Sequence, residues 1–244
     1  MHRLVRSSLY ILVIAATAPA IAAPFTVASP EASSQKKLKI EAEFKDTANK
    51  DTLILPKLEL TLPVQQGLHV AIKGHLRTVD KTNAPSETGP GDIELKAKWN
   101  FHPAGEGQIA MTIEPMLSLP TGDHDRGLGN GHTGIALPLI LGYKTGPWEL
   151  GSEIGYEYIF GGHKHKEYAG VLAMRRITPS LRLGSEFVVE AKDRDFHHLS
   201  TRANIGFKLK VGANGELDGL IGHELHAIDH HEEKKFKISY AIKW

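Results

Sequence analysis

Histidine is frequent in this sequence, and several histidines lie beside other potential metal ligands. The 244 residues include 14 histidines and no cysteine. His163 and His165 are separated by one residue, and His230 and His231 lie between two acidic residues. Imidazole nitrogens combined with carboxylate oxygens suit Zn²⁺ or Cu²⁺. These four histidines therefore form a candidate metal site, with ordinary solvated polar loops as the alternative; no cofactor is expected.

Glutamates recur at even spacing, which raises the question of acid–base chemistry. Glu153 and Glu157 could act as a general acid and a general base if both faced one substrate. The same spacing places them on one face of a β-strand, where every second side chain points the same way. The nearest serine–histidine pair is Ser200 with His198, which would suit a lipid hydrolase. We predict no catalytic residue and no enzyme, and keep the lipid hydrolase as the less favoured alternative.

The first 22 residues have the layout of a secretory signal peptide. Arg3 and Arg6 precede an apolar run over residues 9–16, and residues 20–22 form a small-x-small cleavage pattern. The apolar run is too short to span a bilayer, so it predicts export of the protein and not a membrane anchor. The segment contains no acidic residue, so its removal lowers the formal net charge from +1 to −1.

The remainder divides into a short leader and one large domain. Residues 23–36 are rich in proline and serine and predict a flexible leader before a domain over residues 37–244. The near-neutral charge argues against nucleic acid as a partner, since such binders carry a strongly basic domain or patch.

From residue 37 onward the hydrophobic period is two. Apolar residues at 93, 95, 97, 99 and 101, for example, alternate with polar residues at 94, 96, 98, 100 and 102. This pattern predicts strands with one apolar and one polar face. Breaks at turn residues give about twelve strands, at 37–45, 54–64, 68–79, 92–102, 109–119, 133–143, 148–160, 168–176, 181–192, 199–211, 216–225 and 235–244.

The connections between these strands alternate in length. Tight turns follow the even strands, and longer polar loops follow the odd ones, around 46–53, 80–91, 120–132, 161–167, 193–198 and 226–234. Outer-membrane barrels have this parity, with short periplasmic turns and long outer loops. We therefore predict an all-β, transmembrane, antiparallel up-and-down β-barrel, multi-pass in the outer membrane of a Gram-negative bacterium and in contact with its lipid.

Aromatic residues and the last strand support the same fold. Two aromatic girdles are expected at the membrane interfaces, and the predicted members are Trp99, Tyr143, Trp148, Tyr156, Tyr158, Phe236 and Trp244. The final strand alternates Phe236, Ile238, Tyr240, Ile242 and Trp244 and ends on an aromatic residue. This ending resembles the C-terminal signal that the barrel-assembly machinery recognises.

If the apolar face meets lipid, the polar face lines a lumen. The predicted lining residues carry charges of both signs and are Glu94, Lys96, Lys98, Glu114, Glu149, Glu153, Glu157, Arg182, Glu186, Arg202 and Lys208. They could form ion pairs that hold the wall together, line a narrow pore that orients a small solute, or do both. The sequence thus predicts a porin-like channel or transporter for small solutes, with a surface barrel that binds Cu²⁺ or Zn²⁺ as the alternative.

Several motifs resemble a known family. They are Gly89–Trp99, the run Leu117–Asp123 with Pro-Thr-Gly at its end, the glycine-rich Gly127–Gly131, and Thr178–Leu181 before a long strand. Over roughly residues 60–244 the chain resembles the outer-membrane transporters named for the meta pathway of phenol degradation. The resemblance implies an outer-membrane barrel that passes hydrophobic or aromatic compounds.

Overall fold

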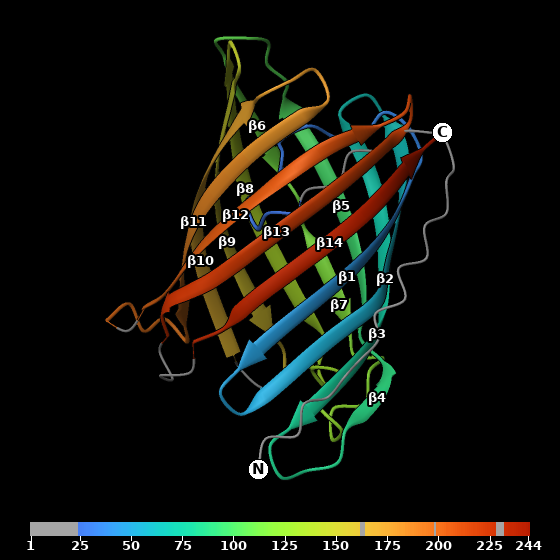
Figure 1. Cartoon of the computed structure of the whole chain (residues 1–244), viewed down its shortest axis with the longest axis vertical. Helices are drawn as coiled ribbons and strands as arrows, with labels where there is room; N and C mark the ends of the chain where they lie inside the picture. The colour runs from blue at the N-terminus through green and yellow to red at the C-terminus, as the bar shows by residue number, and fades with distance from the viewer. Residues whose placement is uncertain (1–23, 162–163, 198, 228–231) are drawn as a thin grey trace.

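The computed structural model describes residues 24–161, 164–197, 199–227 and 232–244, and within these ranges the regular structure is entirely β (Figure 1). The strands are β1 (Lys37–Thr47), β2 (Lys50–Gln65), β3 (Leu68–Lys81), β4 (Glu87–Pro90), β5 (Ile93–His102), β6 (Ile109–Ile113), β7 (Met116–Leu119), β8 (Gly134–Thr145), β9 (Trp148–Ile159), β10 (Lys164–Arg176), β11 (Leu181–Lys192), β12 (Leu199–Val211), β13 (Gly215–His226) and β14 (Lys234–Lys243). No helix long and apolar enough to cross a membrane occurs in the described part of the chain.

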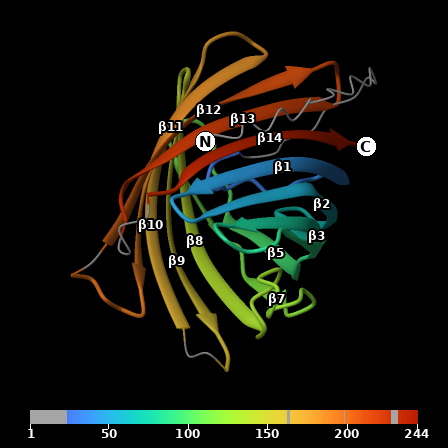
Figure 2. The ribbon, with the colours of Figure 1, turned by 60° about the horizontal axis from the view of Figure 1, so that its bottom comes forward.

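The strands form one closed antiparallel ring. From β8 to β14 and from β1 to β3 each strand pairs with its sequence neighbours, β1 pairs with β14, and β3 pairs with β5. β6 and β7 together occupy one position between β5 and β8, and β4 is a short extra strand on β3. Figure 2 shows the ring obliquely from one end. The predicted barrel of about twelve strands is therefore confirmed, with two short strands in addition.

Burial in this barrel is the reverse of that in a soluble protein. Ile154, Val171 and Ile205 point outward and are 57–61% exposed. Glu41 and Asp218 point inward and are at most 2% exposed. Period two produces both faces from each strand, since consecutive side chains point to opposite sides. The outer wall is thus a continuous apolar band and the lumen is polar, as in transmembrane barrels.

Three local features differ from the sequence prediction. The polar loop expected around 46–53 is only the two-residue turn 48–49, because Thr47 already pairs with Lys50. The strand expected over 109–119 is broken at Glu114-Pro115 into β6 and β7, since proline has no N–H to donate to a ladder. β4 was not expected. The other strands agree with their expected spans within a few residues at each end.

The start of β1, the end of β14 and the turns that follow β2, β5, β8, β10 and β12 share one end of the barrel. The N–H of Trp244 donates to the carbonyl of Lys36 at 3.1 Å, which brings the last strand beside the start of β1. The predicted signal peptide over residues 1–22 lies outside the described residues. Residues 24–36, hereafter the N-terminal segment, contain no strand or helix and lie inside the barrel, with Phe25 and Val27 buried.

The long loop between β7 and β8 folds around a single buried carboxylate. Asp92 Oδ1 accepts the N–H of Gly122 at 2.9 Å, and Oδ2 accepts the N–H of Asn130 at 2.7 Å. Leu128, at the centre of the loop, is 1% exposed. A side chain on Gly129 would collide with Asp92 and with the backbone of Gly122. The Pro-Thr-Gly and glycine-rich motifs therefore build a compact loop at the barrel end opposite Trp244.

Removing this carboxylate should release the loop. Asp92→Ala loses two hydrogen bonds to a charged acceptor, each contributing about 1.5–3 kcal/mol. We expect protease added outside intact cells to cut residues 120–133 in the variant but not in the wild type, while the barrel keeps its heat-modifiable gel mobility. Asp92→Asn, which retains one acceptor oxygen, should be cut more slowly. Equal resistance of Asp92→Ala and wild type would contradict this role.

Candidate functional site: the charged lumen

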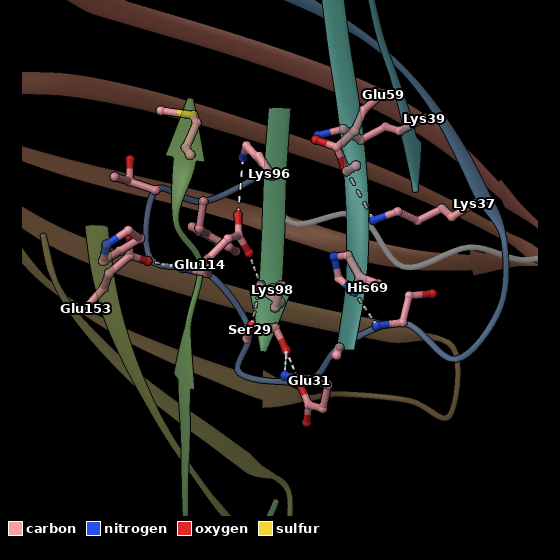
Figure 3. Close-up of a pocket in the computed structure, with 18 of the residues that line it drawn as sticks. Ser29, Glu31, Lys37, Lys39, Glu59, His69, Lys96, Lys98, Glu114 and Glu153 are labelled. Carbon is pink, nitrogen blue, oxygen red and sulfur yellow. Dashed lines mark hydrogen bonds and ion pairs between the residues drawn. The ribbon is translucent and has the colours of Figure 1, made fainter. Parts of the chain in front are cut away.

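The lumen contains a cavity of about 520 Å³ between the N-terminal segment and inward-facing side chains of the wall (Figure 3). Eight of the eleven predicted lining residues border it, namely Lys96, Lys98, Glu114, Glu149, Glu153, Glu157, Arg182 and Lys208. The other three contact different groups. Glu94 pairs with Lys73, Arg202 lies between three glutamates, and Glu186 holds the N-terminal segment.

The cavity lining has a part rich in lysine and a part rich in glutamate. Lys37 and Lys39 of β1 and Lys96 and Lys98 of β5 line one side. On this side Glu114 accepts from Lys98 Nζ at 2.6 Å and from Lys96 Nζ at 3.3 Å, and Figure 3 shows it between the two. The glutamate-rich part comes from every fourth residue of β9, namely Glu149, Glu153 and Glu157.

Most of these charges belong to ion pairs that link strands. Arg182 contacts Glu149 at 3.1 Å and Glu216 at 3.2 Å and so joins β9, β11 and β13. Lys57 contacts Glu41 at 2.8 Å and Glu43 at 3.1 Å. Removing one partner of such a buried ion pair leaves an uncompensated charge, so each residue of the pair depends on the presence of the other. The lumen is therefore both a charged path and a network that fixes the wall.

The N-terminal segment is held by side chains from strands on several sides of the lumen. Glu186 of β11 accepts the N–H of Thr26 at 2.8 Å and that of Val27 at 2.9 Å. Glu153 of β9 accepts the N–H of Ala28 at 2.7 Å. These carboxylates supply the hydrogen bonds that an irregular, buried backbone would otherwise lack.

Further along, the carbonyl oxygens of the segment receive hydrogen bonds from the basic side. Lys98 Nζ donates to the carbonyl of Ser29 at 2.8 Å. Asn100 Nδ2 and Thr112 Oγ1 donate to the carbonyl of Pro30 at 2.9 and 2.6 Å. The segment therefore crosses the lumen from the basic to the acidic side and satisfies groups on both.

One charged contact of the segment lies nearer solvent. Glu31 forms an ion pair with Lys144, and both side chains are 48% exposed. Partial burial raises the pKa of Glu31, but the hydrogen bond and charge of Lys144 outweigh it and leave the pKa below its ordinary value. The pair is exposed enough that its contribution to docking is small.

The predicted metal-binding residues do not form a described site. His163, His230 and His231 lie outside the described residues. His165 faces the outer wall and forms a hydrogen bond with Tyr156. No group of three or more histidine, aspartate or glutamate side chains able to hold a metal ion occurs in the described ranges, so the alternative of a metal-binding barrel has no support here.

The lipid-hydrolase alternative also lacks the geometry it needs. Ser200 is 6% exposed and pairs in register with Glu190, which lines the lumen cavity. Cross-strand partners share a face of the sheet, so Ser200 points into the lumen and away from lipid. His198 lies outside the described residues.

The predicted girdle residues lie on the outer wall. Trp99, Trp148 and Trp244 are 42–54% exposed at the end with the short turns. Trp148 lies beneath the guanidinium of Arg175 at 5.4 Å. Tyr143 lies at that end too, whereas Tyr156, Tyr158 and Phe236 lie toward the other end. The placement matches the predicted sorting, and a membrane-anchoring role stays a prediction.

Sequence reasoning missed the docking of the N-terminal segment. Proline and serine predicted a flexible leader, and that composition carries no sign of the hydrogen bonds from Glu153 and Glu186. A usable signal was present elsewhere. Glycines at inward-facing positions of the strands leave space that something must fill, because glycine weakens a strand interior and often marks a close backbone or ligand approach.

Truncating the buried ring of Phe25 should release the segment without opening the wall. Phe25 is 5% exposed, and truncating a buried phenylalanine costs about 3–5 kcal/mol. We expect Ser29→Cys to react faster with a maleimide when combined with Phe25→Ala than alone; the chain has no other cysteine. Ser34→Cys, at an exposed position, should react equally in both backgrounds. Equal labelling rates of Ser29→Cys with and without Phe25→Ala would contradict docking through Phe25.

Comparison with solved structures places the barrel among outer-membrane proteins. An outer membrane channel from Pseudomonas putida F1 superposes with a TM-score of 0.72 at 13% identity and covers 92% of this chain and 100% of its own. The NanC porin gives 0.61 at 9% identity, covering 85% and 100%. The translocator domain of the autotransporter NalP from Neisseria meningitidis gives 0.56 at 11%, covering 87% and 90%.

At these identities the likeness is one of fold, and the barrel belongs in the outer membrane. No curated protein sequence matches the chain. A family model described as "Putative MetA-pathway of phenol degradation" matches residues 46–238, which include nearly the whole strand-forming region. The chain therefore belongs to the family of the MetA pathway of phenol degradation.

Proposed function

We propose that the protein is a non-enzymatic outer-membrane channel for small solutes, including aromatic ones. The observation that carries this proposal is the cavity of about 520 Å³ inside a closed barrel, lined by both basic and acidic residues. Such a path replaces the lipid by polar groups, and its charges select and orient the solute. The family description and the channel-like fold support the same function.

The opposed charges favour solutes that carry a polar group on an apolar body. Lys96 and Lys98 attract anionic groups toward β5, and Glu149 and Glu157 attract cationic groups toward β9. A solute with both signs, or with one charge and one apolar side, can lie across this field in one orientation. The lining residues are thus assigned to solute selection as well as to the wall.

Neutralising the basic side should change ion selectivity. In planar bilayers with a KCl gradient, Lys96→Gln/Lys98→Gln should shift the reversal potential toward cation selectivity, because Glu114 loses both its partners. Lys234→Glu is the control, since this lysine is 71% exposed at the rim and should change the potential little. An unchanged potential in the double variant would exclude a lining role. A bilayer that stays sealed with every form would exclude the channel.

We also propose that the outward residues of β14 are recognised by the barrel-assembly machinery. Phe236, Ile238 and Trp244 form an exposed apolar row, with Trp244 54% exposed at the very end. An unpaired strand with this row is available before β14 joins β1, and is covered by pairing on both edges afterwards.

Loss of the terminal aromatic ring should slow insertion without changing the finished barrel. Trp244→Ala is expected to lower the amount of heat-modifiable protein in outer membranes several-fold. Lys243→Ala changes the neighbouring residue at the end of the same strand and should accumulate normally. Similar amounts of both variants would show that Trp244 is not part of the signal.

A further inference from the structure

Five glycines on the lumen face of the wall form a track that follows the N-terminal segment. They lie on five adjacent strands and are Gly142 of β8, Gly151 of β9, Gly170 of β10, Gly184 of β11 and Gly206 of β12. None has a positive φ, so the backbone conformation does not require glycine. The reason for glycine at these positions is therefore space.

That space is filled by the N-terminal segment. A Cβ at Gly170 would lie 2.6 Å from Val27 Cγ2, and one at Gly184 would lie 3.1 Å from Phe25 Cζ. A Cβ at Gly206 would likewise crowd Phe25, one at Gly151 would crowd Val27, and one at Gly142 would crowd Pro30. The track is thus a groove that receives an aromatic ring at one end.

The ring of Phe25 lies in an apolar pocket at this end of the groove. It packs with Met174 and Leu220, and Leu172 lies against them. The described lumen is otherwise mainly polar, so this cluster is an apolar site within a charged path. A flat aromatic group of similar size would make the same contacts.

Buried carboxylates without counterions surround the groove. Every other inward-facing aspartate or glutamate of the described strands has a lysine or arginine nitrogen within ion-pair distance, whereas Glu153, Glu186 and Asp218 have none. Glu153 and Glu186 are 7% and 3% exposed and bind the segment through backbone N–H groups. Asp218 is one inward position from Leu220, fully buried, and neither oxygen has a hydrogen-bond partner.

We propose that this groove is a binding site for organic cations with an aromatic or similar apolar body, and that the N-terminal segment occupies it as a displaceable internal ligand. The inference rests on the proposed channel function and names its solute class. Phe25 occupies the position of the solute's apolar body. The N–H groups of Thr26, Val27 and Ala28 occupy the position of its cationic group.

Charge gives a cation an advantage over the segment. Neutral donors, which are the N–H groups of the segment together with Tyr168 Oη and Asn204 Nδ2, bind the oxygens of Glu153 and Glu186 but leave their negative charges without a counterion. An ammonium group supplies both hydrogen bonds and opposite charge, and charge-assisted hydrogen bonds are roughly twice as strong as neutral ones. Binding of the solute therefore expels the segment and opens the path that the segment narrows.

A disulfide tests whether the docked segment closes the channel. Val27→Cys/Gly170→Cys places two thiols where the Cβ of one approaches the side chain of the other, within reach of the about 3.5–4.5 Å Cβ separation of a disulfide. The protein has no native cysteine to interfere. We expect conductance in planar bilayers to be several-fold lower after oxidation than after reduction. The two single variants should be insensitive to oxidant.

The rate of cross-linking tests the ligand class without requiring conductance. Phenethylammonium should slow cross-linking by displacing the segment. Butylammonium, which lacks the ring, and 3-phenylpropanoate, which has the opposite charge, should slow it much less. Adding Glu186→Gln should raise the phenethylammonium concentration that gives half-protection by about tenfold, since it removes one charged acceptor. Glu224→Gln, which changes a carboxylate already paired with Arg202, is the matched control.

The outcomes separate this proposal from the channel function. A cross-link that forms fully but leaves conductance unchanged overturns gating by the segment while the channel stands. Equal protection by phenethylammonium and 3-phenylpropanoate overturns the cation site. Absence of conductance both in the reduced double variant and in a protein lacking residues 24–33 overturns the channel function. In that case the cross-linking rates still test the cation-binding site. Retained heat-modifiable mobility shows that each variant is folded.

Discussion

The structure depends on the closure of one backbone hydrogen-bond ladder. In lipid, an unpaired N–H or C=O has no water to bind, so a spanning sheet must have no free edge. Pairing of β1 with β14 and of β3 with β5 removes the edges here. Once the sheet is closed, the two-residue period of each strand assigns every side chain to the lipid or to the lumen. The apolar outer wall and the charged lumen are both consequences.

A polar lumen then imposes its own requirement, because buried charges need partners. The wall meets it with ion pairs such as Arg182 with Glu149 and Glu216. At Glu153 and Glu186 the partners are instead the backbone of the N-terminal segment. The residues that hold the wall together are therefore the ones to which we assign solute selection, and the proposed binding site lies at the exceptions to ion pairing.

Features set by local sequence were predictable, and features set by register were not. The alternation of apolar and polar residues over β5 predicted both the bounds of the strand and the face that lines the lumen. Twelve alternating segments of this kind predicted the twelve strand positions of the barrel wall. Arg182 and Glu149 lie on strands separated by β10, so their contact depends on side-chain length and on registers that no spacing reveals. The turn at 48–49 was hidden because Lys50 and Asp51 look like loop residues but still pair in the ladder.

Glycine illustrates the same limit. Gly146 has a positive φ of 53° in a turn, where local sequence suffices to explain it. Gly170 and Gly184 are glycines because Val27 and Phe25 lie against them, and those residues are far away in the chain. Reading glycine only as flexibility or as a turn therefore misses the groove, and reading proline and serine only as flexibility misses its occupant.

The N-terminal segment leaves the ribosome before any of the strands that receive it. Its hydrogen bonds to Glu153 and Glu186 span 125 to 160 residues, and its groove requires β8 to β12 side by side. Chain order and spatial order are thus opposed: a segment that is made before every strand is among the last parts able to dock. A barrel arrested before β12 joins would have a complete N-terminus and nowhere to place it. Docking of this segment is therefore coupled to completion of the wall, so that an unfinished barrel would leave its lumen without the segment.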